Sequence, residues 1–235
     1  MSAGRTARER VRAELIREIT GIARRQLATE GAAGLSLRAV AREMGMVSSA
    51  IYRYFPSRDD LLTELIIDGY NAVGEAVERA DAGADAGDFA GRWLAVCRAV
   101  REWALAHPHE YALLYGSPVP GYQAPDRTVP AALRDTLVLA RIVTEAHAAG
   151  ALDPAGPLPP VPPTLANDMA CARAAVLMDV PDDVIARCFT AWAALYGTVS
   201  FELFGQFNNV IEERAVYFDH TMTLLGRLVG LQPRP

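Results

Sequence analysis

The sequence predicts an all-α protein in two parts: an N-terminal three-helix domain with a helix-turn-helix over residues 1–62, and a larger helical bundle over residues 63–235. Apolar residues recur every three to four positions, which is the period of an amphipathic helix. No segment alternates apolar and polar residues as a half-buried strand does. The charge also divides the chain. Residues 1–58 contain 11 arginines and five acidic residues, a formal charge of +6, whereas residues 59–235 carry −11.

The first predicted helix covers residues 8–30. It ends near Gly31 and Gly34, because glycine is the usual residue just past a helix C-terminus. Its apolar residues lie three to five positions apart, so they share one face that packs on the rest of the domain. This stripe consists of Val11, Leu15, Ile19, Ile22 and Leu27.

Two short helices are predicted next, over residues 37–43 and 47–54. Ser36 is a good N-cap for the first of them, since its hydroxyl can accept a hydrogen bond from a free backbone N–H. Gly45 separates the two, because a tight turn favours a residue that tolerates positive φ. The residues that hold the two helices together are Val40, Ala41, Met46 and Ile51.

The remaining chain is punctuated by glycine- and proline-rich segments. Ser57 is the predicted cap of a fourth helix that runs to about Ala80. Further helices are expected at 88–106, 108–114, 129–149, 164–177, 182–205 and 210–230. Residues 81–87, 116–126 and 153–163 are expected to be connectors or loops, the last with six prolines.

The outward side chains of the third helix point to nucleic acid as the partner of the basic N-terminal part. They are short or hydrogen-bonding, which suits insertion into a DNA major groove. The competing interpretation is an ordinary helical corner, since many helical proteins contain two short helices around a glycine turn. The outward residues are Ser48, Ser49, Ala50, Tyr52 and Arg53.

Residues 10–65 resemble the DNA-binding domain of the TetR family of repressors. In that family a Thr or Ser opens the second helix, Ala and Gly mark the turn, an aromatic segment closes the recognition helix, and a basic residue follows three positions later. The matching residues here are Ser36, Ala41, Gly45, Tyr52, Tyr54, Phe55 and Arg58. Two departures bear on operator preference, because Tyr54 stands where His is common and Ser49 where Gly is common.

The resemblance implies roles for individual residues on double-stranded operator DNA. Arg38 is expected to read a base, namely guanine, through its bidentate fork. Ser48, Ser49 and Ala50 are expected to face the groove, and Arg53 to contact either a base or phosphate. The expected phosphate contacts are Ser36, Tyr52, Tyr54 and Arg58. Arginines 5, 8, 10 and 12 form either an arm along the DNA or a solvated tail.

The last two predicted helices carry apolar residues at alternating steps of four and three. This pattern fits an intrachain core, and it also fits a four-helix bundle with a second copy. The TetR resemblance implies the second arrangement, a homodimer through these helices, which a palindromic operator also requires. The candidate interface residues are Ile185, Trp192, Val199, Ala215, Phe218, Met222 and Leu225.

Aromatic residues are concentrated beside two proline-rich loops in the C-terminal part. They are either core residues or the lining of a pocket for a small, mostly apolar effector that releases the DNA. The segment also resembles the WHG subgroup of TetR C-terminal domains, with Tyr196 in place of the expected His. The candidate ligand-binding residues are Trp93, Trp103, Tyr111, Tyr115, Tyr122, Trp192 and Tyr196.

Other function classes find little support in the sequence. The motifs of nucleophilic, nucleotide-binding and metal-dependent enzymes are absent, so neither catalysis nor a cofactor or metal site is expected. Cys97, Cys171 and Cys188 form no CxxC pair and are expected to be buried, reduced thiols in a cytoplasmic protein. No apolar stretch is expected to span a membrane. A DNA-bound activator or architectural protein without an effector, or a helical enzyme, are the alternatives.

Overall fold

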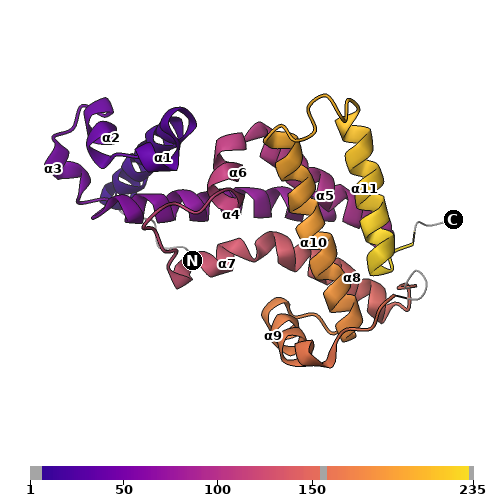
Figure 1. Ribbon diagram of the computed structural model, residues 1–235. Helices are drawn as coiled ribbons and strands as arrows, with labels where there is room; N and C mark the ends of the chain where they lie inside the picture. Colours follow the sequence, from indigo (N-terminus) through magenta and orange to yellow (C-terminus); the bar gives the residue numbers. More distant parts are fainter. Residues whose placement is uncertain (1–6, 154–157, 233–235) are drawn as a thin grey trace. The chain divides into compact units, whose positions relative to one another are not determined.

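The computed structural model describes residues 7–153 and 158–232, which are built from helices and connecting loops (Figure 1). Its α-helices are α1 (Ala7–Gly34), α2 (Leu37–Glu43), α3 (Ser48–Ile51), α4 (Arg58–Ala82), α5 (Phe89–Ala106), α6 (Pro108–Tyr115), α7 (Val129–Ala132), α8 (Arg134–Ala148), α9 (Ala166–Val176), α10 (Asp182–Leu203) and α11 (Arg214–Val229). Within the described ranges the pairing of extended backbone is limited to one bridge between Leu152 and Leu231. The all-α fold class is confirmed.

Several predicted helices differ from the observed ones in their bounds; α1, for example, extends to Gly34 instead of ending at residue 30. Three of the differences have a local cause. α3 is shorter than the predicted 47–54, because residues 52–54 continue as turns, with Tyr54 N–H bound to the Ile51 carbonyl at 2.9 Å. The predicted 129–149 helix is divided into α7 and α8 at Leu133. α11 begins at Arg214 rather than 210, because the preceding residues form turns in which Asn209 has a φ of 60°.

The chain forms two compact units that are not two continuous segments. The first unit contains residues 1–69 together with 108–129, and the second contains residues 70–107 and 130–235. This differs from the continuous division at residue 62, since α6 and the loop after it return to the first unit. The chain therefore crosses between the units three times, after residues 69, 107 and 129.

The core of the first unit forms around α1. The C-terminal part of the predicted apolar stripe is buried, whereas Val11 at its start is 54% exposed. The residues of the first unit that are buried alongside the stripe come from α2, α3 and α4. They include Val40, Ala41, Ile51, Phe55, Leu61, Leu62 and Leu65. Of the four residues predicted to join the short helices, Met46 alone is only half-buried.

The turn between α2 and α3 has the expected local chemistry. Ser36 Oγ accepts a hydrogen bond from Ala39 N–H at 3.4 Å, so it caps α2. Gly45 has a φ of 67°, which a side chain would strain, and Met46 N–H then bonds to the Ala41 carbonyl at 2.9 Å. Ser57 caps α4 by accepting from Asp60 N–H at 3.1 Å. Both predicted caps and the glycine turn are confirmed.

Residues 108–129 pack on α1 and on the first half of α4. Arg24 of α1 lies 3.3 Å from Glu110 of α6 and 2.7 Å from Asp68 of α4. Tyr122 and Thr63 share a hydrogen bond of 2.9 Å between their hydroxyls, and Arg127 pairs with Glu64. The loop that follows α6 is therefore bonded to the same helix that follows the helix-turn-helix.

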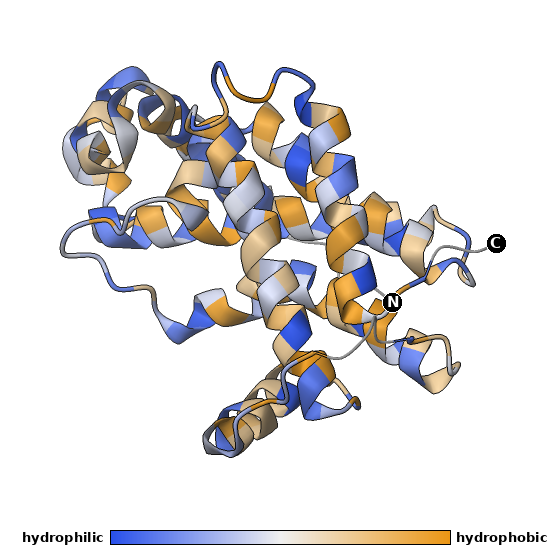
Figure 2. Ribbon diagram, turned by 45° about the vertical axis from the view of Figure 1, so that its right-hand side comes forward, coloured by the Kyte–Doolittle hydropathy of each residue, from blue (hydrophilic) through white to orange (hydrophobic). Residues whose placement is uncertain are grey.

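The second unit is a bundle in which α5 packs against α8, α10 and α11. The predicted inner face of α5 is buried, from Trp93 through Val96 and Val100 to Trp103. Figure 2 shows hydrophobic and hydrophilic residues interleaved along these helices. Such a pattern buries one face of each helix in the bundle.

Arginine–carboxylate pairs fasten the ends of the bundle helices. Arg92 bonds to Asp81 at 2.7 Å and to Glu145 at 2.6 Å, and both Arg92 and Asp81 are almost fully buried. Arg101 holds Glu202 through two bonds of 2.6 and 2.7 Å. Removal of one partner from such a buried pair is costly because the other charge is left without compensation.

α10 is long and apolar enough to cross a membrane by length and composition. The expectation that no stretch reaches this threshold is wrong for this helix. The criterion is also met by core helices of soluble proteins, and α10 packs on α11, α9 and α5. The buried apolar residues of α10 therefore have partners inside the bundle, and one helix of this kind is weak evidence for a membrane.

Candidate nucleic-acid interface

α3 presents small polar side chains on its outer surface. Ser48 and Ser49 are exposed and Ala50 is half-buried, whereas Ile51 is fully buried against the core. The helix is therefore anchored by one residue and offers three short ones to a partner. Tyr52 and Arg53, in the turn that follows, are also exposed.

A hollow of about 250 Å³ lies beside the start of α2. It is lined by the first residues of α2 and the two before them, by the turn after α3 and by the first residue of α4. Four of the predicted DNA contacts line it, namely Ser36, Arg38, Tyr52 and Arg58. Arg38 is exposed and has no hydrogen-bond or ion-pair partner among the described residues. A free guanidinium, two hydroxyl groups and a helix N-terminus beside one hollow can hold a phosphate oxygen.

Arg58 has a structural task that the sequence did not predict. Its Nη2 donates to the Ala32 carbonyl at 2.6 Å and its Nε to the Leu35 carbonyl at 3.2 Å. These carbonyls belong to the end of α1 and the connection to α2. Arg58 therefore fastens the start of α4 to the start of the helix-turn-helix, and its phosphate role stays a prediction.

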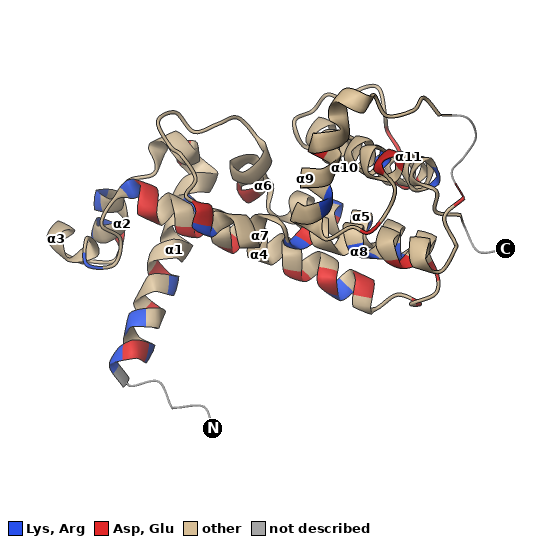
Figure 3. Cartoon of the chain, turned by 90° about the horizontal axis from the view of Figure 1, so that it is seen from below, with Lys and Arg blue, Asp and Glu red and all other residues tan. Residues whose placement is uncertain are grey.

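The N-terminal arginines begin a helix rather than an extended arm. Arg8, Arg10 and Arg12 lie in α1 and so form neither a disordered arm nor a free tail, whereas their contact with DNA stays a prediction. Arg5 lies outside the described residues. Arg12 donates to the Arg53 carbonyl at 3.4 Å and its guanidinium lies 5.3 Å from the centre of the Tyr54 ring. Figure 3 shows basic residues on this part of α1 and near α2.

Two further exposed residues near the predicted DNA contacts were not predicted from the sequence. Arg42 lies one turn after Arg38 on α2, is exposed, and has no side-chain partner among the described residues. The i, i+4 spacing could have identified it. Val47 is 72% exposed at the N-cap of α3, and its apolar character concealed it, because an apolar residue at a helix start is ordinarily read as core.

The predicted dimer residues divide between core and surface. Ile185, Val199, Phe218 and Met222 are each at most 1% exposed within the single chain, so a partner could not reach them, and their assignment is corrected to the chain's own core. The α10–α11 heptad residues pack against each other within one chain, which is why the pattern misled. Ala215 is exposed, Leu225 is half-buried, and Trp192 is 39% exposed.

Instead, other apolar side chains are exposed on the outer faces of α10 and α11. We call them the outer face; its members are Phe189, Phe201, Phe204, Val216, Tyr217 and Leu224. Their exposed fractions lie between 38% and 65%. Gly197, in the middle of α10, has no heavy atom within 4 Å of the position that a Cβ would take.

The aromatic residues proposed to bind a ligand fall in both units. Tyr111, Tyr115 and Tyr122 belong to the first unit, and Trp93, Trp103, Trp192 and Tyr196 to the second. Tyr196 hydroxyl donates to the buried carboxylate of Asp135, whose pKa is raised chiefly by burial. Trp103 is stacked on His107, with ring centroids 5.4 Å apart, and its indole N–H has no partner among the described residues. Their joint role in one pocket stays a prediction.

The cysteines and the loop after α10 contain no metal site. Within the described residues no group of three or more His, Cys, Asp or Glu could hold a metal ion. Cys97 is buried and Cys188 is half-buried, and burial raises the pKa of Cys188 to about 12. Cys171 is exposed, which corrects the expectation that all three are buried.

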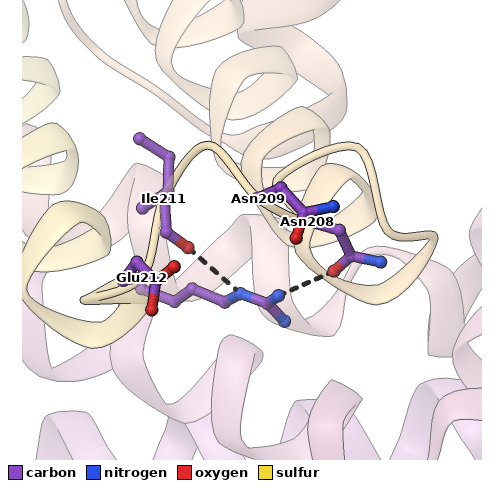
Figure 4. Close-up of a pocket in the computed structure, with 5 residues that line it drawn as sticks. Asn208, Asn209, Ile211 and Glu212 are labelled. Carbon is purple, nitrogen blue, oxygen red and sulfur yellow. Dashed lines mark hydrogen bonds between the residues drawn. The ribbon is translucent and has the colours of Figure 1, made fainter.

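A polar hollow lies in the loop between α10 and α11 (Figure 4). Its Arg214 is already bound to Asn208 at 2.7 Å.

Comparison with known families gives two matches along the chain. A family model described as "Bacterial regulatory proteins, tetR family" matches residues 19–65. A second, described as "Tetracyclin repressor-like, C-terminal domain", matches residues 93–225. The first match covers the helix-turn-helix and the second covers most of the bundle.

Whole-chain relatives agree with these matches. The HTH-type transcriptional regulators Rv1816 of Mycobacterium tuberculosis and Mb1846 of Mycobacterium bovis are each 41% identical over 223 residues, covering 94% of this chain and 93% of theirs. The solved regulatory protein SCO4313 is 35% identical with a TM-score of 0.76, covering 94% of this chain and 98% of that one. A regulatory protein in the tetR family from Rhodococcus RHA1 shares the fold, with a TM-score of 0.61 at 17% identity over 92% of this chain and 97% of its own.

Proposed function

The chain belongs to the TetR family of transcriptional regulators, with a DNA-binding helix-turn-helix, and from that premise we propose that it is a cytoplasmic, dimeric repressor released from a palindromic operator by a small effector. The observation that carries the proposal is the group of exposed hydrogen-bonding residues around α2 and α3. Ser48, Ser49 and Arg38 are exposed there, on helices whose opposite sides are fully buried. A rigid helix pair with a polar outer surface is what major-groove binding requires.

Individual contacts follow from position and exposure. Ser48, Ser49 and Ala50 face the groove, and Arg38 reads guanine through its free guanidinium. Tyr52, Tyr54 and Ser36 contact phosphate, and Arg53 contacts either. We add Arg42 as a phosphate contact, because it lies beside Arg38 on the exposed side of α2. Arg58 acts as a positioning residue through the carbonyls of Ala32 and Leu35, and a phosphate contact would use its Nη1, which lies 3.5 Å from Asp59 Oδ1.

The outer face supports the dimer. Its large apolar side chains are exposed on two adjacent antiparallel helices, and exposed apolar surface of this kind marks protein interfaces. Gly197 lies in the same helix with open space above it, although a glycine inside a helix costs about 1 kcal/mol relative to alanine. We assign this glycine to the close crossing of α10 with α10 of a second copy.

Three chain crossings link effector binding to the DNA-binding unit. α4 is shared between the units, and α6 continues from α5 into the first unit. Within that unit Tyr122 bonds to Thr63 on α4 and Arg127 pairs with Glu64. A movement of the bundle helices would therefore reach α4 directly along its own length and also through the Tyr122 and Arg127 contacts. A movement of α4 would in turn change the spacing of the two recognition helices in a dimer.

The proposal is tested by selecting DNA from a random pool with the purified protein. The affinity of the protein for the selected sequence is then measured by fluorescence anisotropy. Arg38→Ala is expected to weaken binding by about 1–3 kcal/mol and to relax discrimination at one base pair in each half-site. Arg79→Gln, on the exposed surface of the second unit, is the matched control and should bind as the wild type does. An Arg38→Ala variant with full selectivity would overturn the base-reading role.

The competing hypothesis is that the chain binds no effector and acts as an activator or an architectural protein. A panel of small apolar molecules separates the two, because a ligand that releases DNA must also bind the DNA complex more weakly, by the same factor. Calorimetry with and without operator DNA measures that factor. Equal ligand affinity in both titrations would reject the switch.

A further inference from the structure

A second hollow lies within the second unit, where the first turns of α5 meet the last turn of α11. Its volume is about 280 Å³. Both helices belong to the same compact unit and pack against each other. Nothing in the DNA-binding account uses this hollow.

The floor of the hollow is apolar and fixed in place. Trp93 lines it, and its indole N–H donates to the Met222 carbonyl at 3.0 Å, which sets the ring's orientation. Gly226 lies against this ring, since a Cβ there would come 3.2 Å from Trp93 Cδ1. Leu231, almost fully buried, extends the apolar lining.

Two opposite charges line the same hollow without forming an ion pair with each other. Asp88 Oδ1 accepts a hydrogen bond from Gly91 N–H at 2.9 Å, so it caps α5, and its second oxygen keeps its acceptor capacity. Arg227, in the last turn of α11, has no side-chain partner among the described residues. A ligand with one positive and one negative group could form an ion pair with each of these two side chains.

Other arginines near these helices are already paired, which distinguishes Arg227. On α5, Arg98 binds Asp219 of α11 through bonds of 2.8 and 2.6 Å. In the polar hollow of Figure 4, Arg214 is held by Asn208 and by the Ile211 carbonyl. Arg98 and Arg214 thus have partners within the chain, whereas Arg227, unpaired within the described part of the chain, lies beside the apolar floor of the hollow.

We propose that this hollow binds a free α-amino acid with an apolar side chain, its carboxylate on Arg227, its ammonium on Asp88 and its side chain over Trp93. A simple carboxylate would meet Arg227 but lie beside the like charge of Asp88, and a simple amine would have the reverse problem. A zwitterion meets both charges with the correct sign. The inference deepens the proposed function, on which its regulatory meaning rests.

Calorimetry on the full chain without DNA tests the site directly, with L-leucine as the probe. 4-Methylpentanoic acid lacks the ammonium and isoamylamine lacks the carboxylate, and both keep the branched chain. We expect leucine to bind at least about tenfold more tightly than either, because each charged group adds a charge-assisted hydrogen bond. Equal affinity of the three probes, or no binding of leucine in the millimolar range, would overturn the proposal.

Matched variants separate the charges from the fold. Asp88→Asn keeps the helix cap, since Asn caps as well as Asp, and should weaken leucine by about tenfold while leaving 4-methylpentanoic acid no weaker. Arg227→Gln should weaken leucine by about tenfold and spare isoamylamine, and Arg79→Gln should change nothing. Leucine binding that survives both Asp88→Asn and Arg227→Gln would refute the assignment. Because DNA is absent, failure here leaves operator binding standing, and failure of operator binding leaves this site standing.

Discussion

Replacement of Arg58 by alanine tests the most specific structural role found in the DNA-binding unit. The variant loses two hydrogen bonds from a charged donor, at 2.6 Å to the Ala32 carbonyl and 3.2 Å to the Leu35 carbonyl. Hydrogen bonds to charged groups contribute about 1.5–3 kcal/mol each. The two bonds together would contribute about 3–6 kcal/mol, but the side chain is 32% exposed, so solvent screening reduces the expected loss to about 2–3 kcal/mol.

Urea unfolding followed by circular dichroism measures this loss, and amide hydrogen exchange localises it to the end of α1 and the start of α2. Arg38→Ala is the control, because Arg38 is exposed without a partner among the described residues and should change the free energy of unfolding by less than about 0.5 kcal/mol. An Arg58→Ala protein that unfolds at the wild-type urea midpoint, with unchanged exchange, would refute the reasoning.

The other predictions concern the second unit. Asp81→Asn removes the buried carboxylate that pairs with Arg92 and Arg141 and leaves Arg92 with Glu145 alone. It should lower the free energy of unfolding by about 3 kcal/mol, the lower end for a broken buried pair, whereas Glu75→Gln, in an exposed pair, should stay within about 1 kcal/mol in the same urea titration. Gly197→Leu should convert dimers to monomers in sedimentation; a dimer of unchanged affinity would contradict the crossing there. The hydrogen bond from Arg134 lowers the pKa of Glu78 below 4.5. Ionised Glu78 therefore contributes to the free energy of unfolding above pH 4.5, and this contribution is lost as the pH falls through the lowered pKa. Arg134→Gln should reduce this loss of stability in acid, and an unchanged dependence of stability on pH would count against the pairing.

Local signals predicted the DNA-binding unit well. The caps at Ser36 and Ser57 and the turn at Gly45 depend on residues close in sequence, and each is observed. For the same reason α2 was predicted at its observed bounds and the start of α3 to within one residue, although α3 ends earlier than predicted. Long-range roles were not visible, because the two carbonyls that bind Arg58 lie more than twenty residues away, and no side-chain pattern indicates a bond to backbone.

The bundle shows the limit of periodicity. The steps of four and three in α10 and α11 correctly predicted two apolar helices, but they could not tell which apolar face meets the chain's own core. Phe218 and Met222 are buried within one chain, whereas Val216 and Leu224 are exposed beside them. Only the three-dimensional packing of α5 and α10 against α11 decides between these faces.

The return of residues 108–129 to the first unit was also beyond the sequence. A helix and a proline-rich loop give no sign of the unit to which they belong. Their assignment depends on contacts such as Tyr122 with Thr63, which are separated by 59 positions. Polar pairs of this kind are too common in sequences to be recognised without a structure.

Hydroxyl-radical footprinting on DNA selected from a random pool tests the central claim most directly. A dimer that reads DNA through α2 and α3 should protect two patches related by a palindrome, with centres about one helical turn, roughly 10 base pairs, or a multiple of it apart. Protection of both patches should weaken together in Arg38→Ala. A single protected patch, or a pool that yields no preferred sequence with the wild-type protein, would contradict the account.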